Sequence, residues 1–306
     1  MFLFRHALVI AAALLLAGTR PSLANDGPAK KRIVLVAGDT AKVDVMGHHD
    51  YLAGCKCLDA LLRETEGVET VRVNDGWPAD THVFDGANSL VFYTDGAGKQ
   101  AFLKSPDRVA TMQALADAGV GLVMIHQAVD FPKEFAKQGE AWLGGIYLQG
   151  KSSRGHWPSK HIEFPSHPIT RGVTAWQIND GWLNGLQFVD KMQGITPLVW
   201  SGKDYEESRA GLDPQIVAWA FERPAGGRSF SFTGLDAHSA WDLKGIRQLM
   251  VNGVLWSAGV EIPSKGAPCE IEKAELQAMQ TPREPKKPAK PPQKKAAEKK
   301  ATAPKS

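Results

Sequence analysis

The feature that most constrains the fold is a short apolar run that ends in two polar side chains. Val120 to Ile125 has the length of a strand buried on both faces, and His126 and Gln127 follow it directly. In open parallel α/β sheets the ligand crevice lies at the carboxyl ends of the strands. His126 is therefore the first candidate for a functional residue, at a turn where many α/β enzymes carry a Ser or Cys nucleophile.

The rest of the chain repeats the alternation of apolar runs and helical patterns that this strand suggests. Before it, the sequence predicts strands at 31–38, 68–73 and 88–93 and helices at 51–63 and 107–118. Beyond Asp130 the periodicity weakens; Lys160 to Phe164 alternates, and loop and edge structure is expected from His167 to Trp182. Later strands are expected at 187–190, 196–200, 215–222 and 227–233, and a final helix at 243–258. The pattern predicts an α/β protein with a doubly wound, mainly parallel sheet and helices on both faces.

The two ends differ in composition from this body. Arg5 precedes an apolar stretch from Ala7 to Ala17, and Ser22-Leu23-Ala24 fits a signal-peptidase site, so an exported, periplasmic or envelope-associated protein is expected. The expected segments are a signal peptide (1–24), a linker (25–31), one α/β domain (32–262), a short C-terminal extension (263–280) and a basic tail (281–306).

The positive net charge belongs to the tail. Residues 281–306 hold nine Lys and Arg against two Glu, whereas residues 25–280 hold 25 basic and 31 acidic side chains. A segment of Pro, Lys and Ala has too few apolar side chains to fold, so a disordered, solvated tail is expected. The alternative is electrostatic contact with an acidic envelope polymer, a lipid headgroup or nucleic acid. No specific nucleic-acid site is predicted, and the oligomeric state is open.

Three cysteines constrain the fold little. Cys55 and Cys57 lie two apart on an expected helix and point to different faces, so they cannot bridge each other. Cys269 could pair with one of them in an oxidising compartment, or all three could be buried thiols. The spacing fits no CxxC pattern or zinc finger.

Polar residues collect at the expected strand ends and in the irregular middle. Imidazole serves as a metal ligand or as a general base near neutral pH, and His with Asp can hold a divalent ion such as zinc. A single histidine of this kind is more simply structural or exposed, whereas two that share one crevice indicate function. The candidates are His48-His49-Asp50, Asp95, His126-Gln127, His156-Trp157, Asp180 with Trp182, and Asp236 with His238.

Several tryptophans in expected loops suit a sugar ring. Trp182 and Trp241 lie near Gly, Asp or His, where an apolar face stands beside hydrogen-bonding groups. The alternative is that such tryptophans cover the ends of the sheet.

An ordered series of motifs runs through the chain: the first strand, His48 to Gly54, Ile125 to Lys133, His167 to Gly172, Asp180 to Trp182, Gly227 to Gly234 and Val251 to Trp256. Together they resemble the ThuA-like family, named for trehalose utilisation. The resemblance covers about Lys31 to Val260 and implies the class I glutamine amidotransferase-like fold, with a flavodoxin-like sheet and a role in carbohydrate metabolism. It also argues against glutamine hydrolysis, because His126 matches the position of the amidotransferase cysteine.

Two motifs depart from the family pattern. Where many members resemble Asp-Glu-Trp-Tyr, this chain has Gly181 and Leu183 in place of the carboxylate and the phenol. Where many resemble Gly-Gly-His-Phe-His, this chain replaces the first histidine with Asp236 and keeps His238. The departures put transferred catalytic roles in doubt, although Asp236 could still bind metal or accept a proton.

The leading hypothesis is an exported hydrolase or lyase that acts on a sugar or an oxidised sugar, with a divalent metal as a possible aid. The alternatives are a noncatalytic carbohydrate-binding protein and an envelope scaffold. The expected catalytic residues are His126, Asp236 and His238, and the metal-ligand candidates are His126, His156 and His238. The expected substrate-binding residues are His48, Gln127, Asp95, His156, Asp180, Trp182 and Trp241.

Overall fold

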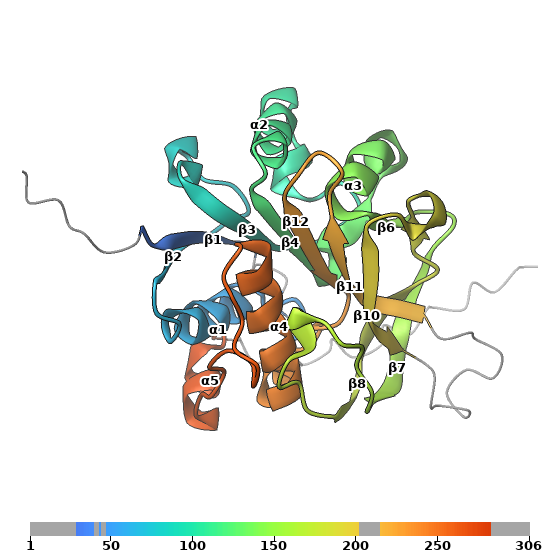
Figure 1. The fold of residues 1–306 in the computed structure, drawn as a ribbon. Helices are drawn as coiled ribbons and strands as arrows, with labels where there is room; N and C mark the ends of the chain where they lie inside the picture. The colour runs from blue at the N-terminus through green and yellow to red at the C-terminus, as the bar shows by residue number, and fades with distance from the viewer. Residues whose placement is uncertain (1–28, 40–42, 44–46, 202–214, 283–306) are drawn as a thin grey trace, which may run out of the picture.

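The computed structural model describes residues 29–39, 43, 47–201 and 215–282, and a seven-stranded sheet forms its centre (Figure 1). The strand order is β10-β11-β12-β4-β3-β1-β2. The five strands from β12 to β2 are parallel, while β10 and β11 run antiparallel at one edge. The strands are β1 (Lys31–Ala37), β2 (Val68–Val73), β3 (Ala87–Tyr93), β4 (Gly121–Ile125), β10 (Ile195–Ser201), β11 (Gln215–Glu222) and β12 (Arg228–Phe232).

Helices cover both faces of this sheet, and two apolar cores result. One core lies between the sheet and α1 (Tyr51–Arg63) with α4 (Lys244–Ser257), and the other lies beneath α2 (Pro106–Asp117) and α3 (Ala136–Leu143). α4 lies close to β12 because Gly253 faces Phe230, whose ring would stand 2.2 Å from an added Cβ. The doubly wound parallel sheet predicted from the alternating pattern is confirmed.

The irregular middle of the sequence contains the main difference from prediction. β7 (Ser153–His161) and β8 (Trp176–Asn184) form a nine-residue antiparallel pair, where only loop and edge structure was expected for 167–182. The pair buries Trp157 and Trp182 on its inner side. Strand β8 was not predicted because Asp180 and Gly181 beside Trp182 suggested a loop, and Gly155 and Pro158 hide the alternation that would identify β7.

Shorter elements connect these layers. Three short strands form a second small sheet: β5 (Asp130–Phe131), β6 (Gly145–Leu148) and β9 (Gln187–Phe188). Single 3₁₀ turns lie at Thr81–Phe84, Ala101–Leu103, His126–Val129, Lys133–Phe135, Pro168–Thr170, Asp190–Met192 and His238–Asp242.

The C-terminal extension is tied to the start of α1. Its helix α5 (Lys273–Met279) packs on α1 and buries Leu276. Thr281 then donates from its backbone N–H and its hydroxyl to the two carboxylate oxygens of Asp50, at 2.9 and 2.7 Å. Asp50 also caps α1 by accepting from the Ala53 N–H. Thr281 is therefore held against the start of α1.

Removing this hydroxyl is expected to loosen the extension. Thr281→Ala should lower the free energy of unfolding by about 1 kcal/mol, since a buried carboxylate loses one hydrogen bond. Chemical denaturation followed by circular dichroism measures the change. Thr281→Ser keeps the hydroxyl and should match the parent, and equal stability of all three proteins would contradict the role of this contact.

The three cysteines are not cross-linked. Cys55, Cys57 and Cys269 are free and buried, and burial raises the pKa of Cys55 to about 12. The cross-link considered for Cys269 is therefore not formed.

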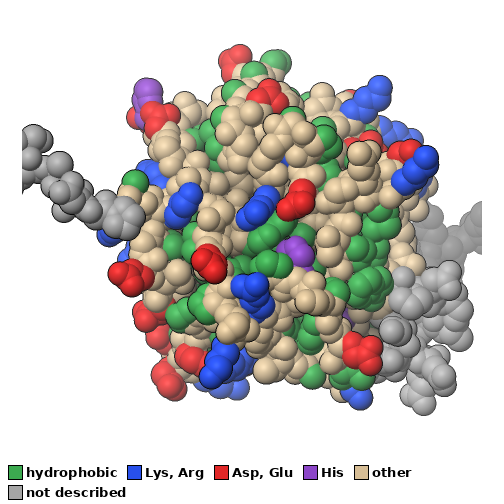
Figure 2. Space-filling view, viewed as in Figure 1, with side chains coloured by type: hydrophobic (Ala, Val, Ile, Leu, Met, Phe, Trp, Pro, Cys, Tyr) green, Lys and Arg blue, Asp and Glu red, His purple; other side chains and the backbone are tan. Residues whose placement is uncertain are grey.

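None of the described helices is long and apolar enough to cross a membrane. On the face drawn in Figure 2, acidic and basic side chains are interspersed rather than gathered into a patch of one sign.

The ends of the chain lie outside the described residues. The expected signal peptide at 1–24 and the tail beyond Pro282 both fall there. Of the expected linker, residues 29–31 are described, and Lys31 is the first residue of β1.

Candidate functional site

Four segments meet at the carboxyl edge of the parallel strands. Asp95 follows β3, His126 follows β4 and Asp236 follows β12, while His48 and His49 precede α1. The loops are joined by a bridge between His48 and Ala237 and by a 2.9 Å hydrogen bond from the His49 N–H to the Asp236 carbonyl. The parallel topology therefore gathers side chains that lie far apart in the sequence.

The carboxylate of Asp236 is the centre of the cluster. Its Oδ1 lies 3.0 Å from Nε2 of His49 and 3.3 Å from Nε2 of His126. Its Oδ2 lies 2.7 Å from Nε2 of His156, which comes from β7. Three imidazoles from three separate segments thus converge on one acidic group.

A second layer orients these rings. The Nδ1 of His49 lies 3.2 Å from Asp95 Oδ1, and the Tyr51 hydroxyl donates to the same oxygen at 2.5 Å. The Nδ1 of His126 lies 3.0 Å from the carbonyl oxygen of Thr233. Gln127 contributes an amide nitrogen 3.3 Å from His49 Nε2. Both central imidazoles are therefore held at Nδ1 and present Nε2 to Asp236.

His126 occupies a sharp turn. Its φ is 56°, in the left-handed region that non-glycine residues seldom adopt, and its side chain is 3% exposed. The strand ends at Ile125 and a 3₁₀ turn starts at once, which directs the imidazole into the sheet edge rather than along the strand. Non-glycine residues in such conformations are concentrated at functional sites.

The cluster extends from solvent to the interior. The His156 side chain is 56% exposed and His49 is 26% exposed, whereas Asp236 is 5% exposed. His48 lies beside His156, with ring centroids 5.4 Å apart. A molecule that arrives from solvent would meet His156 and His48 first, with Asp236 behind them.

Asp180 shapes the loop that carries Asp236. Its carboxylate accepts backbone N–H groups from Leu235 at 2.7 Å, Ala237 at 3.2 Å and Gly181 at 2.9 Å. Asp180 is 1% exposed, and burial raises its pKa. The side chain expected to contact substrate is thus an internal clamp.

Gly181 leaves the space in which Asp236 lies. In the β7–β8 pair Gly181 stands opposite His156. A Cβ at position 181 would lie 2.3 Å from Asp236 Oδ2 and 2.9 Å from its Cβ. The two departures from the family pattern are therefore spatially coupled, because the carboxylate of Asp236 adjoins the position from which a side chain is absent.

The charges of the cluster support one another. Burial lowers the pKa of His49, but the nearby carboxylates of Asp236 and Asp95 outweigh burial and raise it to about 9. The contact with His49 is the main cause that holds the pKa of Asp95 well below its usual range. Burial would raise the pKa of Asp236, but His126 and His49 together lower it strongly. In metal-free protein at neutral pH His49 is cationic and both carboxylates are ionised.

This coupling predicts a pH dependence of stability in chelator-treated protein. The pKa of His49 is higher in the folded protein than in the unfolded chain, so protonation of His49 stabilises the fold. This stabilisation is fully present below the unfolded pKa near 6.5 and is lost as the pH rises through about 9. The free energy of unfolding should fall by an amount on the order of 2 kcal/mol over this window. Denaturant titrations between these pH values measure it. Residue 49 has a left-handed backbone with φ of 59°, which asparagine tolerates, so His49→Asn is the suitable variant. It should flatten the dependence of stability on pH, and an equally steep dependence in this variant would contradict the role of His49.

The structure brings together most of the predicted site residues. His126, His156 and Asp236 are in direct contact, and the remaining members lie around them: His48, Asp95 and Gln127. His49 and Tyr51 were not singled out from the sequence. The only signal for His49 was its place in the His48-His49-Asp50 cluster, and Tyr51 looked like an ordinary helical residue.

Other predicted site residues lie elsewhere. Trp182 and Trp241 are fully buried and belong to the core, so neither side chain is exposed to a sugar. His238 is buried, and its Nε2 lies 3.3 Å from the Leu276 carbonyl of α5. It belongs to neither group of three potential ligands found among the described residues. The expected convergence of His126, His156 and His238 is thus realised for the first two, with His49 as the third imidazole.

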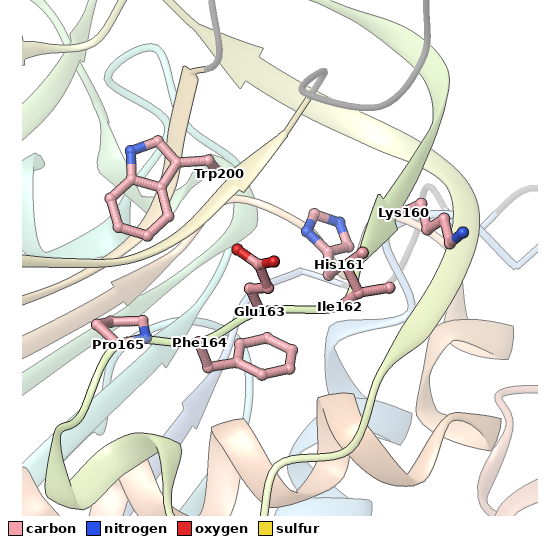
Figure 3. Close-up of a pocket in the computed structure, with 7 residues that line it drawn as sticks. All are labelled: Lys160, His161, Ile162, Glu163, Phe164, Pro165 and Trp200. Carbon is pink, nitrogen blue, oxygen red and sulfur yellow. The ribbon is translucent and has the colours of Figure 1, made fainter.

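A separate cavity lies at the far end of β7. It has a volume of about 350 Å³ and is lined in part by His161, Glu163 and Trp200. In Figure 3 the Glu163 carboxylate points into the space beside Trp200, while the Lys160 amine points away from it. Along an extended strand, His161 is five residues from His156, roughly 16 Å at the usual rise. We therefore place the candidate site at the His–Asp cluster, where the chemistry is concentrated.

The mainly parallel α/β sheet agrees with the class I glutamine amidotransferase-like fold that the resemblance implies, with His126 at the elbow after β4 in place of a nucleophile. The sequence profile of the family ThuA, described as trehalose utilisation, matches residues 34–257. The chain belongs to the ThuA family, and this membership supports a role in carbohydrate metabolism.

Solved structures agree with the family. A ThuA-like protein from Bacteroides uniformis ATCC 8492 has a TM-score of 0.58 at 12% identity, and the match covers 82% of this chain and 99% of that one. A ThuA-like protein from Parabacteroides merdae ATCC 43184 has a TM-score of 0.55 at 12% identity, with 79% and 98% covered. These identities establish the fold alone. The chain matches no curated protein at a significant level.

Proposed function

We propose that this protein is an exported, metal-assisted hydrolase or lyase that acts on a sugar or an oxidised sugar. The observation that supports it is the convergence of His49, His126 and His156 on Asp236 in a member of the ThuA family. Grouped imidazoles and carboxylates can take up and release protons near neutral pH, as hydrolysis and elimination both require.

The exposure of each group suggests its role. His156 is the most exposed imidazole of the cluster and is oriented by Asp236, so it is placed to exchange a proton with a bound substrate. Asp236 stabilises the imidazolium that forms, and His126 Nε2 lies 3.3 Å from the other oxygen of that carboxylate in the interior. His48, Asp95 and Gln127 lie around this centre and offer hydrogen bonds to sugar hydroxyl groups.

Turnover of a sugar panel tests the proposal. The chain without residues 1–24 would be incubated with trehalose, other disaccharides and their ring-oxidised derivatives. Products would be followed by chromatography and mass spectrometry. We expect cleavage or elimination that falls about a hundredfold or more in His156→Gln, since general acid–base groups contribute on that order. His82→Asn, which alters an exposed histidine paired with Asp85, is the control. Full activity in His156→Gln would contradict the role of His156.

A noncatalytic sugar-binding protein is the second candidate. It is favoured by Gly181, which lacks the carboxylate of the family pattern, although Asp236 supplies one in the adjoining space. Calorimetry that finds sugar affinity without any turnover would select this candidate. Glutamine hydrolysis is not proposed, because the elbow carries His126.

The location and the tail are further parts of the proposal. Export to the periplasm or envelope is supported by the sequence of residues 1–24, and contact of the tail with acidic envelope polymers by its nine basic residues. Cell fractionation of the full chain and of a chain that ends at Pro282 tests both. Cytoplasmic retention of the full chain would contradict export, and an unchanged envelope fraction after truncation would contradict the tail contact. The same unchanged fraction would also count against a scaffold that acts through its tail.

A further inference from the structure

Two buried atoms at the centre of the site lack hydrogen bonds. His126 Nε2 and Asp236 Oδ1 lie 3.3 Å apart without hydrogen-bond geometry, and the charged contact of Oδ1 is with His49 Nε2 at 3.0 Å. Buried polar atoms in folded proteins are nearly always paired. Two such atoms that face each other without hydrogen-bond geometry indicate a position suited to a cation.

The surroundings of the imidazoles distinguish a metal ion from a structural ion pair. The Thr233 carbonyl can only accept a hydrogen bond, so the Nδ1 of His126 carries a proton, and Nε2 is the nitrogen that can offer a lone pair to a metal ion. The Nδ1 of His49 faces the carboxylate of Asp95 in the same way. Histidines that bind metal through one nitrogen usually donate the other N–H to a carboxylate or a carbonyl. Both histidines show this arrangement.

We infer that His49 Nε2, His126 Nε2 and Asp236 Oδ1 form a binding site for one zinc ion. The three ligand atoms lie within 4.8 Å of one another. The contacts of Asp236 Oδ1 with the two nitrogens, 3.0 and 3.3 Å, are close to the edges of a tetrahedron with bonds of about 2.1 Å. Two imidazoles and a carboxylate suit zinc and leave a fourth position for a water molecule or a sugar oxygen.

A second set of potential ligands shares Asp236. His48, His156 and Asp236 also lie within 4.8 Å of one another. In that set, however, His156 Nε2 and Asp236 Oδ2 share a 2.7 Å hydrogen bond, so a proton already joins these two atoms. The zinc site is therefore the inner set, and His156 remains available for proton transfer.

This inference deepens the metal assistance of the proposed function, and its test needs no sugar. Zinc would be titrated calorimetrically into the chelator-treated mature chain. We expect one zinc per chain, with affinity at least a hundredfold lower in His49→Asn and in His126→Asn. His82→Asn is the matched control and should bind as the parent does. Zinc binding without sugar turnover would leave this inference standing and remove the enzymatic proposal.

Three results would overturn the inference. They are a parent that binds no zinc, a stoichiometry other than one, and affinities unchanged in both variants. Cobalt spectroscopy on the unaltered chain gives an independent measurement in case a variant fails to fold. Four-coordinate cobalt with nitrogen ligands supports the site, and a spectrum of fully hydrated cobalt contradicts it.

Discussion

Replacing Asp236 with asparagine is expected to lower zinc affinity roughly a hundredfold or more and sugar turnover about a thousandfold. Asparagine keeps the size of the side chain but removes the negative charge that faces His49, His126 and His156. The cluster then loses both a metal ligand and the group that stabilises imidazolium at His156. Calorimetric zinc titration and steady-state kinetics at neutral pH measure the two effects.

An exposed aspartate provides the control for this substitution. Asp85→Asn removes a carboxylate that is 74% exposed and pairs with His82. It should leave zinc affinity and turnover unchanged. A variant of Asp236 that retained both would show that the convergence of imidazoles on this carboxylate is structural only.

Introducing glutamate at position 181 is expected to destabilise the protein by about 3 kcal/mol, because overpacked sites cost energy of this order. The new Cβ would lie 2.3 Å from Asp236 Oδ2, and a second carboxylate would stand beside the first. The loop clamped by Asp180 would have to move, so zinc binding should weaken as well. Denaturant unfolding and zinc titration follow the two changes.

A paired substitution separates crowding from other causes. If position 181 and position 236 compete for the same space, Gly181→Glu combined with Asp236→Gly should recover at least half of the lost stability. Sites in contact show such non-additivity, whereas independent sites do not. The coupling would be contradicted if Gly181→Glu were as stable as the parent. It would also be contradicted if the double variant lost the sum of the two single losses in free energy of unfolding.

The sheet was predictable because its strands are buried on both faces. Continuous apolar runs such as those at 121–125 and 215–222 identify a central strand without any knowledge of its partners. The helix 51–63 shows one apolar face, and Ser105 with Pro106 marks the start of α2. These signals are local, so the sequence carries them fully.

The β7–β8 pair was missed because its stability does not come from a local pattern. Its buried residues include the polar Ser159, His161 and Asp180, and polar side chains at buried positions break the apolar alternation that identifies a strand. Trp182 illustrates the same difficulty. Its indole donates to the Trp157 carbonyl and its ring packs in the core, although glycine and aspartate beside it suggested a loop.

The sequence predicted where the site lies but only some of the residues that form it. Topology places the ends of β3, β4 and β12 at one edge, so Asp95, His126 and Asp236 followed from the strand pattern. The choice between His49 and His238 depended on loop geometry. A backbone hydrogen bond from His49 to Asp236 directs one imidazole inward, whereas α5 engages the other. No sequence spacing encodes that difference.

Crystallography tests directly whether zinc binds between His49, His126 and Asp236. Crystals of the chelator-treated chain soaked in zinc would be measured on both sides of the zinc absorption edge. We predict one anomalous peak within bonding distance of His49 Nε2, His126 Nε2 and Asp236 Oδ1. A zinc-soaked crystal without a peak between these three atoms would contradict it.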